Sequence, residues 1–177
     1  QILHHETDVG KNKALSARDS LEKLNSTIEI EVFTCAITQD HSEVIQHADV
    51  VIDCCDNLQT RRLINSLCWQ QQTPLISGSA IRMEGQLIHF PMRTQDPCYD
   101  CVASLFAEQS LSCMEAGVLS PVVGTIGTLQ ATEALKSLLN MPPEQVTMTL
   151  YDAQRLQFNN FKISKKTDCP TCSLPRN

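Results

Sequence analysis

Hydrophobic positions recur along the chain at spacings typical of helices and strands. Between Lys11 and Leu24 the apolar residues stand three and four positions apart, as in an amphipathic helix. From Ile28 to Val32 they alternate with glutamates, which is the pattern of a half-buried strand. Val50 to Ile52 is an unbroken β-branched run, typical of a strand covered on both faces. The pattern therefore predicts a helix followed by two strands.

The remainder of the chain continues this alternation. A polar turn follows Ile52 and leads into a helix that is expected to bury Leu63, Ile64 and Leu67. Strands alternating with helices predict an α/β fold with a Rossmann-like, mainly parallel sheet, whose ligands bind at the carboxyl ends of the strands. The other expected elements are helices at 42–47 and 124–139 and strands at 74–80, 85–90, 146–151 and 156–163.

Composition limits the classes of function. A chain of 177 residues, 42% of them hydrophobic, can bury one sizeable core, so we expect a single domain over residues 1–177. The net charge of -6 and the lack of a Lys/Arg block argue against a nucleic-acid partner. No stretch approaches the roughly 20 apolar residues of a membrane span, and the opening QILHHETD has no secretory pattern. We therefore expect a cytoplasmic protein without a membrane partner.

The cysteines indicate a metal centre. Cys35, Cys54 and Cys68 lie within apolar stretches and are expected to be small core residues. Two C-x-x-C pairs in a cytosolic chain favour one tetrahedral zinc, closed to water and therefore structural, which would staple the tail onto the domain. The alternative is a pair of redox motifs or unrelated core cysteines. The four expected zinc ligands are Cys98, Cys101, Cys169 and Cys172.

A polar turn follows the buried strand at Val50 to Ile52. Asp53, Asp56 and Asn57 lie at its carboxyl end, where an open α/β sheet binds ligands. A carboxylate there can hold Mg²⁺ bound to nucleotide phosphate. The same residues, followed by Thr60 and Arg61, also fit an ordinary helix start. Chemistry alone leaves both interpretations open.

Longer motifs connect these features to a known family. The run DVVIDCCDNLQTRRLIN, preceded by DVGKNKALSARDSLEKLN and followed by PLISGSAIRMEGQL, resembles the MoeB/ThiF/HesA family in order and spacing. So do PCYDCVASLFAEQSLSCMEAGVLSPVVGTIGTLQATEALKSLL and the closing CPTC. Members are bacterial relatives of ubiquitin-activating enzymes. The resemblance implies ATP-dependent adenylation of the C-terminal glycine of a small ubiquitin-like sulfur-carrier protein, for molybdopterin or thiamine synthesis, by a homodimer.

The resemblance also implies roles for individual residues. Asp56 resembles the family's metal- and ATP-associated aspartate, and Lys13, in D-x-G-x-x-K, resembles the lysine that contacts nucleotide phosphates. Asn57 and Arg61 belong to the same motif and are expected to support the nucleotide crevice. Cys113 stands where ThiF-type proteins carry a cysteine that bonds to the carrier, although MoeB-like proteins carry one without evident need for it in adenylation. ATP, Mg²⁺ and Zn²⁺ are the implied cofactors.

One family feature is missing from the sequence. Members have a glycine-rich phosphate loop and arginines upstream of the stretch that begins here at Gln1, and no glycines of this chain form such a loop. We therefore expect the first nucleotide-binding βαβ unit to be absent and this chain alone to adenylate weakly or not at all. The alternative is a non-catalytic, zinc-stapled module that binds the carrier or acts as a scaffold. A nicotinamide-dependent dehydrogenase fits poorly because the dinucleotide loop is missing.

Overall fold

The computed structural model describes residues 2–103 and 117–176. It divides into two compact units, Gln1–Ile37 and Thr38–Asn177, and each is described by itself. A single domain over residues 1–177 stays a prediction.

The first unit is built around the helix α1 (Lys13–Leu24), preceded by the short 3₁₀ helix η1 (Glu6–Asp8). The segment before η1 folds back on α1: the His4 ring lies 2.8 Å from Ser16 Oγ, and Ser20 Oγ donates to Leu3 O at 2.6 Å. The predicted helix at Lys11 to Leu24 is therefore confirmed, beginning two residues later.

The prediction of a strand at Ile28 to Val32 is wrong. These residues form no ladder with any described strand. Alternating apolar and acidic residues suit a pleated edge, but a strand exists only where a neighbour accepts its hydrogen bonds. Cys35, expected in the core with this strand, is correspondingly exposed.

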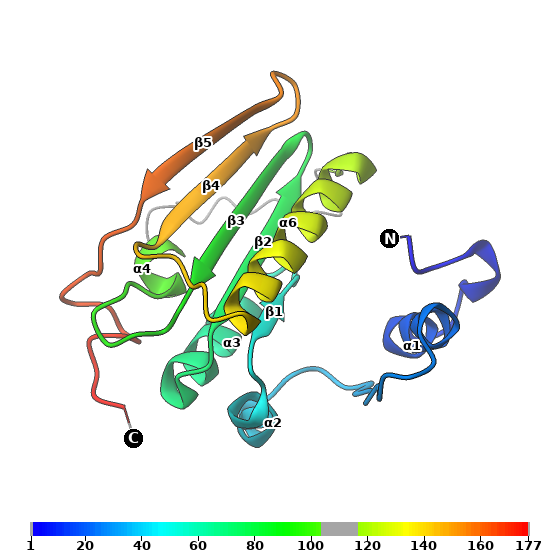
Figure 1. Cartoon of the computed structure of the whole chain (residues 1–177), viewed down its shortest axis with the longest axis horizontal. Helices are drawn as coiled ribbons and strands as arrows, with labels where there is room; N and C mark the ends of the chain where they lie inside the picture. The colour runs from blue at the N-terminus through cyan, green and yellow to red at the C-terminus, as the bar shows by residue number, and fades with distance from the viewer. Residues whose placement is uncertain (1, 104–116, 177) are drawn as a thin grey trace. The chain divides into compact units, whose positions relative to one another are not determined.

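The second unit contains a five-stranded sheet in the order β1-β2-β3-β4-β5 (Figure 1). Each predicted strand from Val50 onward and each predicted helix is present, with ends shifted by a few residues. The strands are β1 (Val51–Asp53), β2 (Leu75–Ile81), β3 (Glu84–Phe90), β4 (Thr147–Asp152) and β5 (Gln157–Lys162). The helices are η2 (Gln39–His41), α2 (Ser42–His47), α3 (Leu58–Gln71), α4 (Tyr99–Ala103) and α6 (Ser120–Leu138).

The fold class is α/β, as predicted, but the expectation of a mainly parallel sheet is wrong. Among the described strands only β1 and β2 pair in parallel, whereas β2–β3, β3–β4 and β4–β5 are antiparallel. The connections explain part of the difference. Helix α3 crosses over between the parallel strands β1 and β2, whereas tight turns join β2 to β3 and β4 to β5. The connection from β3 to β4 is long and includes α4 and α6, and these two strands are nevertheless antiparallel.

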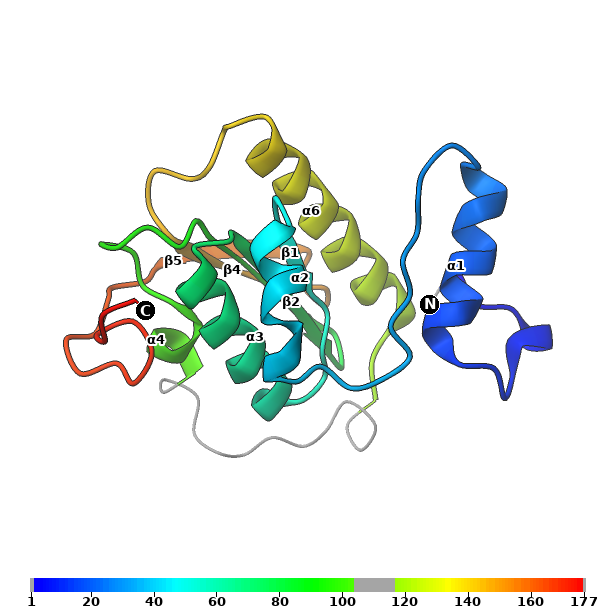
Figure 2. The same ribbon diagram turned by 90° about the horizontal axis from the view of Figure 1, so that it is seen from below.

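Helices cover both faces of this sheet (Figure 2). Helix α6 lies on one face, where Ile126 packs so closely on Gly85 that a Cβ there would come within 2.5 Å of it. Helices α2, α3 and α4 lie on the other side. Ile52 of β1, which is an edge strand among the described strands, is nevertheless 45% exposed, so the expectation that this run is covered on both faces is wrong. Cys54 follows the end of β1 and is exposed rather than in the core, whereas Cys68 is buried as expected.

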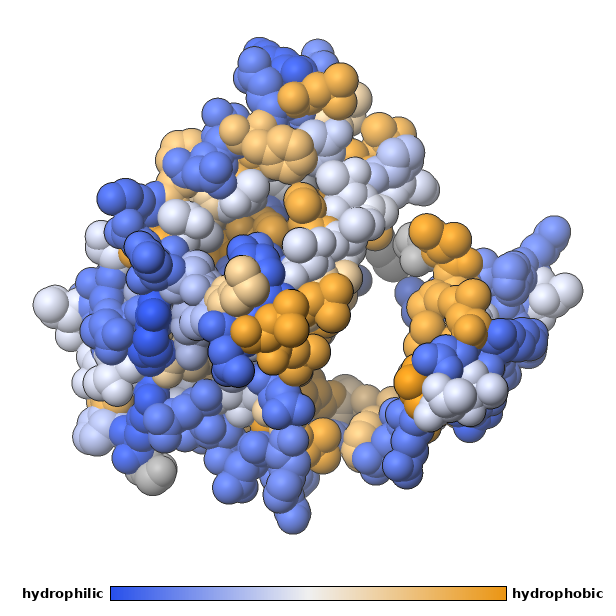
Figure 3. Space-filling model, viewed as in Figure 1, coloured by the Kyte–Doolittle hydropathy of each residue, from blue (hydrophilic) through white to orange (hydrophobic). Residues whose placement is uncertain are grey.

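Apolar side chains also remain on the surface of this unit. In Figure 3 they gather over the C-terminal end of α6, where Leu135, Leu138 and Leu139 are more than half exposed. No helix in the described part of the chain is long and apolar enough to cross a membrane.

Candidate functional site

The turn after β1 is organised by the buried carboxylate of Asp53. This residue ends β1 and is 1% exposed. Its Oδ2 accepts hydrogen bonds from Arg61 Nη1 at 2.9 Å and Ser77 Oγ at 3.0 Å, and its Oδ1 accepts from the backbone N–H of Cys55 at 2.9 Å. Asp53 therefore fixes the first residues of the turn and is not available to solvent.

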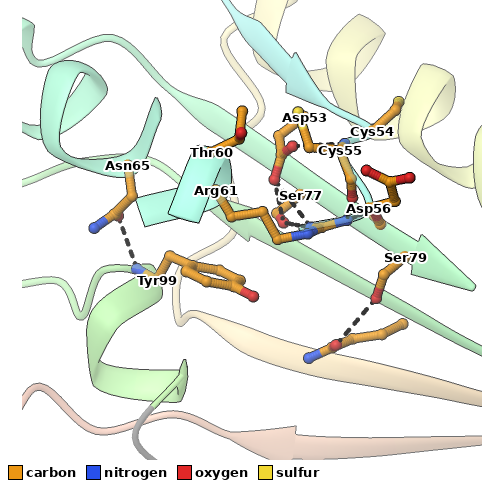
Figure 4. A network of polar contacts seen from close by, with 12 residues as sticks. Asp53, Cys54, Cys55, Asp56, Thr60, Arg61, Asn65, Ser77, Ser79 and Tyr99 are labelled. Carbon is orange, nitrogen blue, oxygen red and sulfur yellow. Dashed lines mark hydrogen bonds and ion pairs between the residues drawn. The ribbon is translucent and has the colours of Figure 1, made fainter. Parts of the chain in front are cut away.

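Arg61 completes the same network from the first turn of α3. Its guanidinium is buried and also donates to Ser77 Oγ at 2.7 Å, to Gly78 O at 2.7 Å and to Cys55 O (Figure 4). One side chain thus connects α3, the end of β1 and the middle of β2. A buried charge with this many partners determines local geometry, and losing it leaves several buried polar groups unpaired.

Gln130 of α6 supports the end of β1 from the opposite face of the sheet. The side chain is 3% exposed, and its Nε2 donates to Asp53 O at 2.9 Å and Ile76 O at 3.3 Å. Its Oε1 accepts from the Cys54 thiol at 3.4 Å. Gly78 makes room for it, since a Cβ there would lie 2.3 Å from Gln130 Cδ. Arg61 and Gln130 together hold the turn from both faces.

Asp56 is the carboxylate that this scaffold leaves exposed. It lies two residues before the start of α3 (Figure 4), and Asn57 Nδ2 lies 3.5 Å from its Oδ1. Asn57 caps the helix, accepting from Thr60 N at 2.8 Å. The helix-start interpretation is therefore confirmed, and metal binding by Asp56 stays a prediction. Asn57 begins the helix, and Asp56 offers an anionic ligand at the carboxyl end of the parallel strand pair, as a metal site requires.

The thiols beside Asp56 are poor nucleophiles. Cys54 lies at the surface, but partial desolvation of its thiol and the neighbouring Asp53 carboxylate raise its pKa, and the same two causes raise the pKa of Cys55 to about 12. A thiol reacts through its thiolate, so these cysteines stay protonated near neutral pH. Asp56 is therefore the exposed anionic group of this turn, and its role in the chemistry stays a prediction.

Lys13 belongs to the first unit. It is the first residue of α1, after the cap in which Asn12 Oδ1 accepts from Ala14 N at 2.9 Å. Asp8 of the same motif pairs with Lys11 at 2.9 Å, and this contact lowers the pKa of Asp8 to about 2. Among the described residues no ion pair engages the Lys13 ammonium group. That Lys13 and Asp56 bind one nucleotide stays a prediction, because they belong to different units.

The four predicted zinc ligands come together. The sulfur atoms of Cys98, Cys101, Cys169 and Cys172 all lie within 4.8 Å of one another and are buried. Two of the separations, Cys98 to Cys169 and Cys101 to Cys172, are 3.6 and 3.4 Å. Four sulfurs at about 2.3 Å from one tetrahedral zinc would be about 3.8 Å apart, so the donor set fits this metal.

Hydrogen-bond donors surround the sulfurs. Asn65 Nδ2 lies 3.5 Å from Cys98 Sγ, and Lys166 N lies 3.5 Å from Cys101 Sγ. The hydrogen bond between Cys98 and Cys101 raises the pKa of Cys98 and lowers that of Cys101 to about 4, whereas burial raises the pKa of Cys172 to about 12. Such N–H donors orient thiolate ligands and stabilise their charge.

One predicted residue is untested, and several residues of the two sites were not predicted. Cys113 lies outside the described residues, so its role is untested. Four buried polar residues that contribute to the two sites were not predicted, because periodicity does not distinguish a polar residue with a buried partner from a solvated one. These are Asn65, Ser77, Asp100 and Gln130.

Comparison with known proteins gives the family. The ThiF family model matches residues 1–171. The chain belongs to the ThiF family. It is 41% identical over 174 residues to the molybdopterin-synthase adenylyltransferase of Salmonella typhimurium, covering 97% of this chain and 70% of that protein. It is 40% identical over the same length to the Escherichia coli protein of that name, with the same coverage.

More distant matches include a further relative and two solved structures with a similar fold. An adenylyltransferase and sulfurtransferase MOCS3 from Xenopus laevis is 39% identical over 183 residues, which cover 99% of this chain and 40% of that protein. Among solved structures, E. coli MccB with MccA-N7isoASN has a TM-score of 0.80 at 17% identity, covering 98% of this chain and 55% of that one. E. coli MccB with ATP has a TM-score of 0.78 at 18% identity, with the same coverage. These structures support the fold.

Proposed function

We propose that this protein is an adenylyltransferase that uses Mg-ATP to activate the C-terminal glycine of a small ubiquitin-like sulfur carrier, in molybdopterin synthesis or, alternatively, thiamine synthesis. The names of its similar bacterial relatives support the reaction class and the pathway. The chain spans about 70% of those relatives. The observation that carries the proposal is the exposed carboxylate of Asp56, presented at the carboxyl end of the parallel strands by the buried Asp53–Arg61 pair.

The reaction joins two anions. An oxygen of the carrier's terminal carboxylate attacks the α-phosphorus of ATP, the bond to the bridging oxygen breaks, and pyrophosphate leaves with that electron pair. Asp56 would bind the Mg²⁺ that neutralises the phosphates, and Lys13 would add a second positive charge. Asn57 and Arg61 act on the shape of the site: the first begins α3 and the second holds the turn in place.

The four-cysteine centre has a structural role in this proposal. A zinc ion held by Cys98, Cys101, Cys169 and Cys172 has no open position for a substrate, and it would bind the C-terminal tail to α4. We propose in addition a cytoplasmic homodimer, as the family resemblance implies. Covalent chemistry at Cys113 remains a separate proposal.

The experiment that tests the function is carrier-dependent ATP–pyrophosphate exchange. It is run with this chain and, in parallel, with the longest polypeptide that its gene encodes, using a carrier that ends in Gly-Gly and one with that ending removed. Exchange is expected only with the intact carrier and is expected to fall at least about 100-fold in Asp56→Asn, because the metal loses its carboxylate. No exchange by the longest polypeptide would reject the enzyme; carrier binding without ATP affinity would favour the scaffold instead.

A further inference from the structure

Helix α3 has contacts with both sites at once. Arg61 and Asn65 are four residues apart, so they project from the same side of the helix. Arg61 contacts the turn that carries Asp56, and Asn65 contacts the cysteine centre. Tyr99 contacts both residues (Figure 4). The centroid of its ring is 6.0 Å from Arg61 Cζ, and its backbone N–H donates to Asn65 Oδ1 at 2.9 Å. Helix α3 therefore connects the four cysteines with the turn that carries the proposed magnesium ligand.

Asn65 uses its whole amide group in this contact. It is 0% exposed. Its Nδ2 donates to Asp100 Oδ2 at 3.2 Å as well as lying 3.5 Å from Cys98 Sγ, while Oδ1 accepts from Tyr99 N. These partners all belong to the first C-x-x-C pair or lie within it. No other residue type of this size supplies two donors and an acceptor in one plane.

Asp100 extends the contact to the second cysteine pair. Its Oδ2 also accepts from Thr171 Oγ1 at 2.5 Å, and Thr171 lies between Cys169 and Cys172. Its Oδ1 pairs with Arg62 Nε of α3 at 3.2 Å. Both halves of the metal centre are thus hydrogen-bonded to the same helix through a buried carboxylate.

We propose that Asn65 is a positioning residue: it transmits the order of the four-cysteine centre along α3 to the turn that presents Asp56. A metal-bound thiolate carries negative charge and accepts the Asn65 N–H more strongly than a protonated thiol does. Zinc binding therefore fixes Asn65, Asn65 fixes α3, and Arg61 on the same helix fixes the turn. This inference rests on the proposed function only in giving the turn its role.

The test measures backbone amide hydrogen exchange at the turn, without nucleotide or carrier. The reporters are the N–H groups of Cys55 and Thr60, which donate to Asp53 and Asn57 respectively. In the wild-type chain, removing zinc with a chelator is expected to speed exchange at both by about tenfold or more. In Asn65→Leu saturated with zinc, exchange is expected to match that of the zinc-free wild type. Zinc affinity should fall about 10- to 100-fold, as for other residues that support metal ligands.

Two further variants separate coupling from general loss of structure. Ser66→Ala changes the adjacent residue of α3 and is expected to leave the zinc affinity and exchange at the turn as in the wild type. Thr171→Val removes the hydroxyl that donates to Asp100 and is expected to act like Asn65→Leu, more weakly, even if Asn65→Leu does not fold. The proposal would be overturned if zinc removal left amide hydrogen exchange at the turn of the wild type unchanged. It would also be overturned if this exchange stayed slow in the zinc-saturated Asn65→Leu and Thr171→Val variants. Neither outcome depends on whether the protein adenylates a carrier.

Discussion

Arg61 and Asp53 form an ion pair with 2.9 Å between Nη1 and Oδ2, and both side chains are almost fully buried. Removing one partner leaves an uncompensated buried charge, which typically costs about 3–5 kcal/mol. We therefore predict that Arg61→Met lowers the free energy of unfolding by about that amount in urea denaturation. Arg155, whose ion pair with Asp152 at 3.0 Å is exposed, is the control.

The control variant Arg155→Met should cost less than about 1 kcal/mol, because surface ion pairs contribute little. The double variant Arg61→Met with Asp53→Leu should be less destabilised than the sum of the two single variants, since neither charge is then left alone. Equal costs for Arg61→Met and Arg155→Met would mean that the buried pair does not hold the turn.

Much of the second unit could be predicted from periodicity. The 3.6-residue spacing in α3 and the β-branched runs of β1 and β2 identify their elements because burial of one face leaves that pattern in the sequence. The C-x-x-C pairs likewise predicted a shared site, because tetrahedral thiolate coordination requires both pairs. Local patterns therefore identified most elements and the four cysteines that lie together, while zinc binding by these cysteines stays a prediction.

Contacts between distant residues could not be read in the same way. Asn65 looks like an ordinary polar residue of an amphipathic helix, and only its proximity to Cys98 and Asp100 shows why it is buried. The prediction of strand direction failed for a related reason: alternation of residue types reports burial and not the direction of the neighbouring strand, and β3 and β4 are antiparallel although α4 and α6 lie between them in the chain. The strand expected at Ile28 to Val32 had the right pattern and no described partner.

Gly78 and Gly124 provide matched tests of packing behind the site. A Cβ at Gly78 would lie 2.3 Å from Gln130 Cδ, so Gly78→Ala must displace the side chain that holds the end of β1. We predict a loss of about 1–3 kcal/mol in unfolding free energy, the usual cost of overpacking. Gly124 in α6 has nothing within 4 Å of its added Cβ, and Gly124→Ala should instead stabilise by about 0.5–1 kcal/mol.

Thermal unfolding of both glycine variants distinguishes the explanations. If Gln130 simply rotates away from an alanine at Gly78, the two variants will have similar melting temperatures. The close contact between Gln130 and the β1 end would then be unimportant for stability.

The cysteine centre should bind one zinc ion per chain. Zinc ligands must be deprotonated, so protons compete with the metal, and zinc should be released as the pH falls. We predict that Cys169→Ser lowers the zinc content of protein purified without chelator and lowers the melting temperature. Cys54→Ser lies outside the centre and should keep the full zinc content. Elemental analysis of the two variants makes this comparison, and wild-type protein without stoichiometric zinc would contradict it.

His89 gives the second unit a pH-dependent stability. The ring is 5% exposed on β3, with Nδ1 3.0 Å from Glu133 Oε2 of α6, and burial lowers its pKa despite this carboxylate; Lys136 and Arg93 add to the lowering. Because the folded-state pKa lies below the unfolded value of about 6.5, the unfolded chain takes up the proton first as the pH falls. Stability from His89 is therefore present above about pH 6.5 and decreases below it.

The measurement is urea denaturation between pH 7.5 and pH 5 for the wild type and for His89→Gln, which keeps a polar group near Glu133. We predict that the wild type loses unfolding free energy across this range and that the variant loses less. Glu133 has a lowered pKa of its own, owing to hydrogen bonds from Lys136 and His89 that outweigh burial, so its contribution also falls with pH, but in the more acidic range below its usual value. An equal slope in both proteins above pH 5 would assign the loss to groups other than His89.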